Sequence, residues 1–267
     1  MYDGASTATS DMSTGAAILR QAMGGGRALA ACFLSTGSTL HAEVIATAGF
    51  DAVIVDGQHG LVSDHELAPL IRTLERDGVP AIVRVARNAP ELIGRALDAG
   101  AAGVIVPMVD TVEDAYAAVA AARYPPQGSR SYGALRASLR GSHSREQENA
   151  QLVLAIMVET APALAAVDDL LAVPGVDAVF TGPADLALSL GLPPTLSPEP
   201  GSEHEQAILR IAQAARAART AAWIAGGSTP AWRRWAEAGY GLVSVASDVG
   251  LLRGASRAAA REARAQG

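Results

Sequence analysis

The chain has 267 residues, a formal net charge of −6 and 49% hydrophobic residues, and all 21 of its basic residues are arginine. The absence of lysine excludes pyridoxal aldimines, Schiff-base aldol chemistry and P-loop phosphate binding, because each of these uses a lysine amine. The acidic balance and the 4% aromatic content argue against nucleic acid and membrane surfaces as partners and favour small-molecule chemistry.

The N-terminal segment and the single cysteine bear on domain limits and location. Residues 1–14 are mostly small and polar, so we expect a frayed start followed by one domain over residues 15–267. We find no signal-peptide pattern and no apolar run of membrane-spanning length, and therefore expect a cytoplasmic protein. Cys32 lies in an apolar run, which predicts a buried and unreactive thiol.

Short β-branched runs alternate with longer Ala/Leu/Arg segments of helical period, a pattern typical of repeated β-α units. Eight such units in about 250 residues predict a (β/α)8 TIM barrel. A doubly wound sheet is less favoured because the first strand leads into a turn without the Gly-x-Gly-x-x-Gly pattern. In chain order, the predicted strands are Leu29–Leu34, Ala52–Asp56, Ala81–Val85, Gly103–Pro107, Leu152–Glu159, Ala178–Gly182, Ala222–Ala225 and Leu242–Ala246.

Two longer connections interrupt this alternation, at Tyr124–Asn149 and at Leu192–Glu205. Connections of this length in a barrel often serve as lids or subunit contacts. For the second one, a variable surface insertion is an equally good interpretation.

Ionisable residues stand where four of the predicted strands end. Asp56 ends the second strand and His59 follows it, Arg84 ends the third, Glu159 ends the fifth, and Asp185 follows the sixth. Because the carboxyl ends of parallel barrel strands meet at one face, these side chains should converge there. A buried strand tip carries a charge only when that charge is paired, bound to a metal or functional.

Each of these residues also has a plain structural interpretation. Glu159 and Asp185 suggest a hard divalent cation such as Mg²⁺ or Mn²⁺, although Asp185 could simply cap a helix. Arg84 could hold a carboxylate or an enolate oxygen, or form a salt bridge to Asp56 or Glu159. His59 on a loop suits proton transfer near neutral pH, whereas an isolated histidine is more often structural.

These residues and their neighbours resemble the HpcH/HpaI aldolase/citrate lyase family, in particular its metal-dependent class II pyruvate aldolases. The resemblance spans nearly the whole chain, and its specificity comes from the ordered set rather than from any one piece. The matching segments are Ala48–Asp51, Asp56–Gly60, Arg84, Leu97–Ala101, Val106–Val109, Arg123–Arg130, Val158–Thr160, Gly175–Asp177, Gly182–Leu186 and Ser247–Leu252.

The resemblance implies a barrel in which Glu159 and Asp185 hold a divalent metal, with Co²⁺ and Zn²⁺ as alternatives to Mg²⁺ and Mn²⁺. Pyruvate would chelate this metal, with Arg84 beside it and His59 assisted by Asp56 and Asp98. The Gly182, Pro183 and Ala184 turn would present backbone N–H groups to the substrate carboxylate. The resemblance also implies a homo-oligomer, commonly a hexamer, in which a C-terminal helix over Leu251–Ala265 packs on a partner subunit.

Three positions depart from the family pattern. Gln58 stands where many relatives have Glu, and Ser131 replaces a glycine. Met157 occupies a substrate-binding position at which some relatives carry a glutamine that touches the substrate. These changes leave metal and pyruvate binding intact and concern the aldehyde partner.

The resemblance therefore implies reversible cleavage of 4-hydroxy-2-oxo acids to pyruvate and an aldehyde, through a pyruvate enolate that the metal and Arg84 stabilise. Two alternatives remain open. An oxaloacetate decarboxylase similar to macrophomate synthase would use the same enolate, and a barrel without catalytic activity would serve as a binding or scaffold protein.

Overall fold

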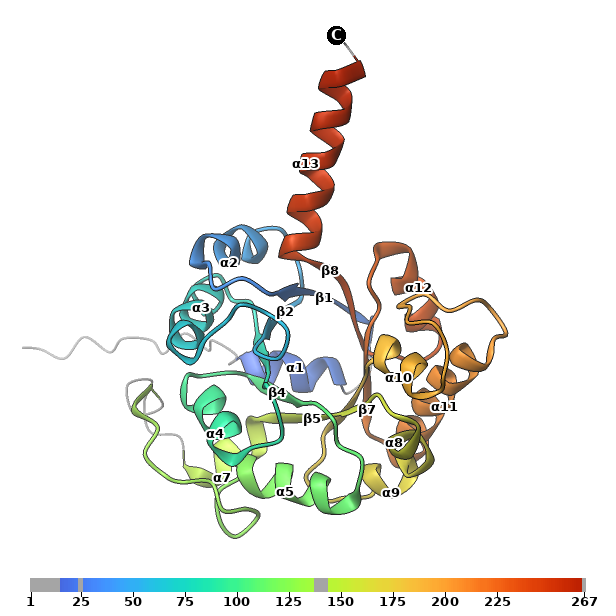
Figure 1. Cartoon of the computed structure of the whole chain (residues 1–267). Helices are drawn as coiled ribbons and strands as arrows, with labels where there is room; N and C mark the ends of the chain where they lie inside the picture. The colour runs from blue at the N-terminus through green and yellow to red at the C-terminus, as the bar shows by residue number, and fades with distance from the viewer. Residues whose placement is uncertain (1–14, 24–25, 137–143, 266–267) are drawn as a thin grey trace, which may run out of the picture.

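A computed structural model describes residues 15–23, 26–136 and 144–265 of the chain, and within them eight parallel strands close into one barrel. Each strand pairs with the next in sequence, and β8 closes the ring on β1. The expected single-domain (β/α)8 architecture is therefore confirmed (Figure 1). The strands are β1 Leu29–Leu34, β2 Ala52–Asp56, β3 Ala81–Arg84, β4 Gly103–Val106, β5 Val153–Val158, β6 Ala178–Thr181, β7 Ala221–Ala225 and β8 Leu242–Ser247.

Side chains of each strand point alternately into the barrel and toward the helices, and those that point inward fill the interior. On β2, Ile54 belongs to the cluster that fills the interior, while Val53 and Val55 belong to the larger cluster between strands and helices. Phe180 and Trp223 are the large aromatic residues of the interior cluster. Burial on both faces explains why the strands read as continuous apolar runs rather than alternating ones.

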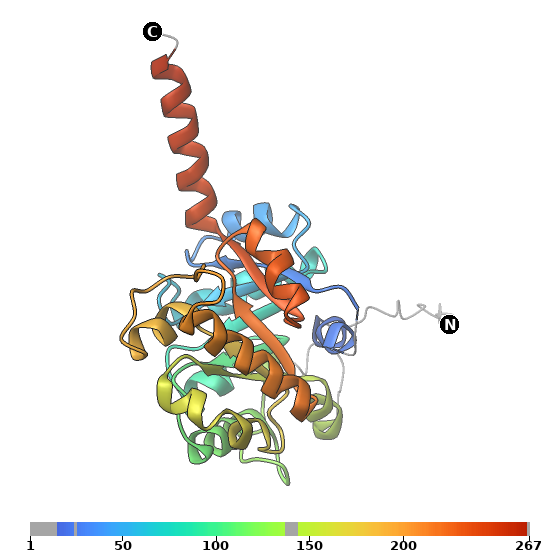
Figure 2. The same ribbon diagram turned by 90° about the vertical axis from the view of Figure 1, so that its right-hand side faces the viewer.

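Helices form the outer layer, which Figure 2 shows from the side. The helices after β2, β3, β4 and β7 follow directly on N-cap residues in extended backbone, which are Ser63, Ala89, Thr111 and Ser228. The helices are α1 Gly15–Met23, α2 Thr39–Ala46, α3 Asp64–Arg76, α4 Pro90–Asp98, α5 Val112–Ala122, α7 Arg145–Gln151, α8 Ala161–Ala165, α9 Val167–Leu171, α10 Pro183–Ser189, α11 Glu203–Ala218, α12 Thr229–Glu237 and α13 Asp248–Ala265.

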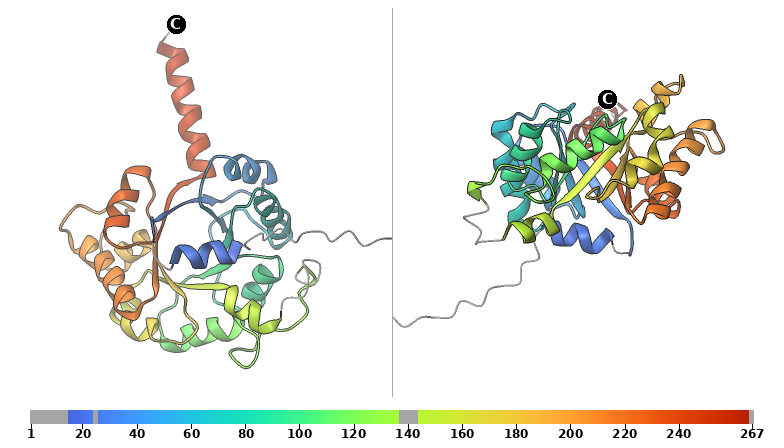
Figure 3. Two further views of the ribbon diagram at one scale, coloured as in Figure 1. Left: turned by 180° about the vertical axis from the view of Figure 1, so that it is seen from behind. Right: turned by 90° about the horizontal axis from the view of Figure 1, so that it is seen from below.

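Two helices stand apart from this layer. Helix α1 precedes the first strand and lies across one end of the barrel (Figure 3). Helix α13 projects away from the barrel (Figures 1 and 2), and Asp248 is its single buried residue in the part that the structure describes.

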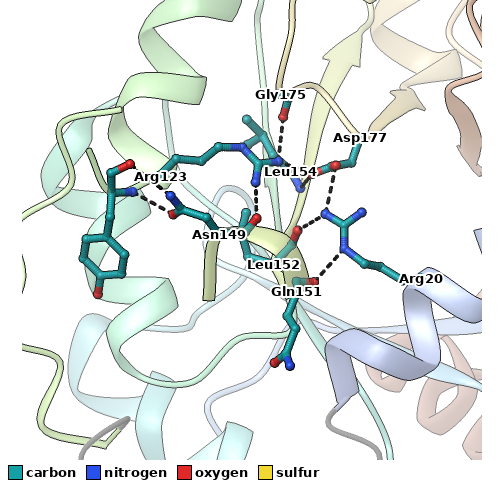
Figure 4. A network of polar contacts seen from close by, with 9 residues as sticks. Arg20, Arg123, Asn149, Gln151, Leu152, Leu154, Gly175 and Asp177 are labelled. Carbon is teal, nitrogen blue, oxygen red and sulfur yellow. Dashed lines mark hydrogen bonds and ion pairs between the residues drawn. The ribbon is translucent and has the colours of Figure 1, made fainter. Parts of the chain in front are cut away.

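A network of arginines and Asp177 closes the end of the barrel beside α1 (Figure 4). The carboxylate of Asp177 accepts hydrogen bonds from Arg20 of α1 (2.9 Å), from Arg123 (2.7 Å) and from the Leu154 backbone (2.8 Å). Arg123 also donates to the carbonyl oxygens of Asn149 and Gly175. These contacts join α1, α5, α7, β5 and the start of β6 at the end where the strands begin.

Most strand boundaries agree with prediction to within one residue. The long connection Tyr124–Asn149 runs into a helix that was not predicted, α7 (Arg145–Gln151), at which Ser144 and Gln147 make a capping box. Cys32 is buried, and burial raises the pKa of its thiol to about 12, which agrees with an unreactive cysteine. The predicted frayed segment, residues 1–14, lies outside the described residues. Among the helices that the structure describes, none is long and apolar enough to cross a membrane.

Candidate active site

The sequence-predicted charges gather at the end of the barrel where the strands finish, which we call the mouth. Asp56 and Arg84 are the last residues of β2 and β3, and they are direct partners in the register of those strands. Val158 and Thr181 are likewise partners, so Glu159 and the turn after β6 leave the sheet side by side. Parallel strand direction thus produces the convergence expected of a barrel active site.

Arg84 and Asp56 form a two-pronged ion pair. Arg84 Nε lies 2.9 Å from Asp56 Oδ1 and Nη2 lies 2.7 Å from Oδ2, and the guanidinium carbon is 5.0 Å from the Phe33 ring centre. Burial alone would raise the pKa of Asp56, but the hydrogen bonds and charge of Arg84, together with the N–H groups of His59 and Gln58, outweigh it and lower that pKa. The salt bridge between Arg84 and Asp56, one of the two predicted roles of Arg84, is therefore formed. Nη1 makes no hydrogen bond within the described residues.

His59 is held by its backbone and exposed at its ring. The N–H groups of Gln58 and His59 donate to Asp56 Oδ1 at 3.1 and 3.2 Å, which curls the chain back over the end of β2. A side chain at Gly60 would place its Cβ 2.3 Å from the Asp56 carbonyl oxygen, so this turn requires glycine. The histidine ring is exposed at the mouth, where it can exchange protons with a bound molecule.

The carboxylate of Glu159 is buried at the mouth and accepts few hydrogen bonds from the described residues. Its residue is 1% exposed, and Oε1 accepts a hydrogen bond from the Met108 N–H at 2.8 Å. Burial raises the pKa of Glu159, and the negative charges of Asp185 and Asp110 act in the same direction. A Cβ at position 182 would lie 2.7 Å from Oε2, so Gly182 keeps the space beside that oxygen open. No donor in the described chain bonds Oε2.

This donor set fits a hard divalent cation. Two carboxylates that repel each other gain from a shared cation, and Mg²⁺ commonly binds one or two protein carboxylates while keeping several waters. In the described residues no group of three or more His, Cys, Asp or Glu side chains is arranged to hold a metal. Substrate and water would therefore supply the remaining ligands.

The turn after β6 differs in detail from expectation. The Gly182 N–H donates to the Val158 carbonyl oxygen (3.3 Å) and Pro183 has no N–H, so neither residue offers an unused N–H group to a substrate carboxylate. The Ala184 and Asp185 N–H groups, in the first turn of α10, are the available donors. Met157 is 1% exposed, and its methyl group packs under Gly182, which makes it part of the floor beneath this turn.

The structure does not bring Asp98 to His59 within one chain. Asp98 is the last residue of α4, and α4 runs from the mouth back to the end where β4 begins. There its carboxylate pairs with Arg130 at 2.6 Å.

Three residues near the predicted set contribute to the site without having been predicted. Met108 adopts a φ of 54°, which directs its N–H to Glu159. Asp110 accepts a hydrogen bond from the Thr160 hydroxyl at 2.6 Å and adds negative charge near Glu159. Phe33 lies under Arg84. The segment Val106–Val109 and the acidic residue after it were the available signal for the first two; nothing marks Phe33.

A cavity of about 270 Å³ lies at the opposite end of the barrel, beside α1. Leu19, Trp223 and Tyr240 are among its lining residues, and its described lining includes no carboxylate. A lining without carboxylates does not suit metal-dependent catalysis, so the mouth is the better candidate for the active site.

Comparison with known proteins gives one consistent result. Residues 29–254 match the family model described as HpcH/HpaI aldolase/citrate lyase. A hydroxypyruvate/pyruvate aldolase of Rhizorhabdus wittichii is 39% identical over 241 residues, 90% of this chain and 96% of that protein. A 4-hydroxy-2-oxovalerate aldolase of Rhodococcus jostii is 36% identical over 239 residues, covering 87% and 90%.

The fold of a solved structure agrees with these sequence matches. A crystal structure of an HpcH/HpaI aldolase/citrate lyase family protein from Burkholderia cenocepacia superposes with a TM-score of 0.84 at 35% identity. The match covers 92% of this chain and 98% of that one, so the similarity extends over the whole barrel.

Proposed function

This chain belongs to the HpcH/HpaI aldolase/citrate lyase family, and from that premise we propose that it is a divalent-metal-dependent aldolase. It cleaves 4-hydroxy-2-oxo acids to pyruvate and an aldehyde, and it catalyses the reverse addition. The names of its relatives support the substrate class. The observation that carries the proposal is the buried Glu159 carboxylate, whose Oε2 accepts no hydrogen bond from the described residues and whose charge interacts with that of Asp185.

Glu159 and Asp185 are the residues that would hold the cation, Mg²⁺ or Mn²⁺ by the hardness of their oxygen ligands. When bound, the cation supplies Lewis-acid polarisation of the 2-oxo group. The N–H groups of Ala184 and Asp185 bind the substrate carboxylate at the start of α10.

His59 and Arg84 act on the substrate itself. His59 takes the proton of the 4-hydroxyl group, the O–H electrons form the aldehyde carbonyl, and the bond between C3 and C4 breaks. Its electron pair moves onto C3 and the 2-oxo oxygen as an enolate, which Arg84 stabilises through Nη1. Return of this proton from His59 to C3 gives the methyl group of pyruvate, and reversal of this last step exchanges the methyl protons. Asp56 keeps Arg84 and the His59 backbone in place.

The remaining expectations concern assembly and location. The exposed first turns of α13 carry Val249, Leu251 and Leu252, and this apolar surface on a projecting helix supports packing on a second copy in a homo-oligomer such as a hexamer. A role for Asp98 beside His59 depends on such a copy, because one chain separates the two residues. A cytoplasmic location stays a prediction.

Exchange of pyruvate methyl protons in deuterated water tests the function without knowledge of the aldehyde. We expect exchange with Mg²⁺ or Mn²⁺ and none after chelation, and we expect Glu159→Gln to abolish it. Glu91→Gln, the same change on the exposed surface of α4, serves as the matched control. Absence of exchange with every divalent cation would mean a binding or scaffold role.

A second assay separates the two enzyme alternatives that share this site. Pyruvate release is measured from oxaloacetate and from a series of 4-hydroxy-2-oxo acids. Faster turnover of oxaloacetate than of every aldol would identify a decarboxylase and contradict the proposed reaction.

A further inference from the structure

Asp248 is a buried carboxylate that none of the steps above uses. It is the first residue of α13, directly after β8, and is 5% exposed. Its Oδ1 accepts hydrogen bonds from the N–H groups of Ser35 (3.0 Å) and Val249 (2.8 Å). Its Oδ2 accepts from the Thr36 N–H (3.1 Å) and the Thr36 hydroxyl (2.6 Å). Three of these four bonds reach outside α13, to the turn after β1.

The turn after β1 is in direct contact with the turn that carries His59. The Ser35 carbonyl oxygen accepts a hydrogen bond from the Leu61 N–H at 2.7 Å. A Cβ on Gly60 would lie 2.9 Å from the same oxygen and 3.1 Å from the Ser35 Cα, so the two turns pack backbone against backbone. Displacement of Ser35 must therefore displace residues 60 and 61.

The turn that carries His59 is thus anchored at both ends by carboxylates. Asp56 binds the N–H groups of Gln58 and His59 before the ring. Asp248 fixes Ser35, which binds Leu61 after the ring. The ring itself is exposed and makes no side-chain hydrogen bond within the described residues, so its position depends on these backbone contacts.

The charge of Asp248 suits this anchoring. Burial disfavours its ionised form, but the hydrogen bonds from Thr36, Ser35 and Val249 outweigh burial and lower its pKa. His41 faces the same carboxylate, with Nδ1 3.6 Å from Oδ2 and 2.9 Å from the Thr36 hydroxyl. An ionised carboxylate accepts from all four donors, whereas an amide at this position would turn its NH₂ group toward some of them.

We infer that Asp248 is a positioning residue for His59, acting through Ser35 and Leu61 on the turn between β2 and α3. The inference rests on the proposed function, because it assigns His59 the proton transfer. It gives the first residue of α13 a part in catalysis besides beginning the helix.

The test is a double-mutant cycle on pyruvate deuterium exchange with Asp248→Asn and His59→Asn. Asp248→Asn should lower kcat about 10- to 100-fold, since small displacements of a catalytic group cost rate on this scale. The KM for pyruvate should stay within about twofold, because Glu159, Asp185 and Arg84 are not displaced. In the His59→Asn background, Asp248→Asn should change the rate by less than about twofold.

Asp51→Asn is the matched control. Asp51 accepts the Ala30 N–H at 2.8 Å, so it anchors β1 at the end opposite to the mouth. Its loss should leave kcat unchanged. If Asp248→Asn fails to fold, Thr36→Val replaces it; this change removes the 2.6 Å hydroxyl bond to Asp248 and the 2.9 Å contact of the same hydroxyl with His41. It should give a smaller fall in kcat and the same pattern in the cycle.

The outcomes separate this inference from the proposed function. Absence of metal-dependent exchange in the wild-type protein overturns the function. With exchange present, three results overturn the inference alone: a kcat unchanged by Asp248→Asn, effects that multiply with those of His59→Asn, or an equal loss in Asp51→Asn.

Discussion

The two ends of the barrel use the same residue types to different effect. At the end where strands begin, Asp177 is shared by Arg20, Arg123 and a backbone N–H, and Arg123 also binds two carbonyl oxygens. At the mouth, within the part of the chain that the structure describes, Glu159 has one backbone donor and Nη1 of Arg84 makes no hydrogen bond.

This difference separates stability from function within one fold. Charges whose hydrogen-bonding capacity is filled by the protein fix neighbouring elements together, as the network around Asp177 does for α1, α5 and β5. Charges whose capacity is left open can accept a ligand. Whether a buried Asp or Arg serves stability or ligand binding therefore depends on how many of its hydrogen-bonding positions the protein leaves unused.

Asp177→Asn tests the stabilising end of the barrel, and it should have the largest effect on the free energy of unfolding. Two arginines lose their carboxylate, and removal of one partner from a buried ion pair costs about 3–5 kcal/mol. We expect a fall of that size in the free energy of unfolding, measured with urea. Activity per folded molecule should be unchanged; a loss of kcat in the folded protein would show that the two ends are not separate.

Glu159→Gln tests the other end, the mouth. The change should reduce aldol cleavage about 100- to 1000-fold, measured as pyruvate release. Because the substitution removes a charge that burial disfavours, the free energy of unfolding in the absence of metal should stay equal or rise by up to about 1 kcal/mol. A large loss of stability would contradict the view that Glu159 is retained for function.

His204 is a buried residue on the mouth side of the barrel that we expect to serve stability rather than function. It lies in the first turn of α11, and α11 packs against α10. Burial lowers its pKa below the usual 6.5, although a hydrogen bond with the Pro183 backbone acts in the opposite direction. The unfolded chain therefore binds the proton more readily, so this part of the stability is full above pH 6.5 and is lost as the pH falls below it.

Thermal unfolding between pH 7.5 and 5 measures this effect. His204→Gln should flatten the pH dependence in that range. An unchanged pH dependence in the variant would assign it to other groups.

The labelling rate of the Cys32 thiol should show the smallest effect, and it reports on substitutions at both ends of the barrel. With its pKa raised to about 12, the buried thiol stays protonated at neutral pH, so a disulfide reagent should react through unfolding alone. The labelling rate should rise in Asp177→Asn and remain near wild type in Glu159→Gln. Rapid labelling of the native protein would indicate local opening of β1 instead.

Much of the fold was predictable, because strands buried on both faces produce uninterrupted apolar runs that stand out between helical segments. Positions of Asp56, Arg84 and Glu159 followed from strand ends. The αL turn at Met108 and the N–H that Gly182 gives to Val158 were not predictable, since both depend on backbone direction at single residues. The role of Asp98 failed to appear within one chain because helix direction carries it to the other end.

Helix α7 escaped prediction for a related reason. Its seven residues, Arg145–Gln151, are almost all polar, so no apolar periodicity marks it. It forms because the capping box at Ser144 and the contacts of Asn149 with Arg123 and Tyr124 stabilise a short helix that its sequence alone would not.

The contacts of α1 impose an order on biosynthesis. Arg20 bonds the carbonyl oxygens of Gln151 and Leu152 and the carboxylate of Asp177, partners that follow it by 131, 132 and 157 positions. At about 5–20 residues per second, a ribosome supplies the last of them roughly 8 to 30 seconds after Arg20 itself. Helix α1 therefore cannot complete these bonds until five of the eight strands and Asp177 have been made.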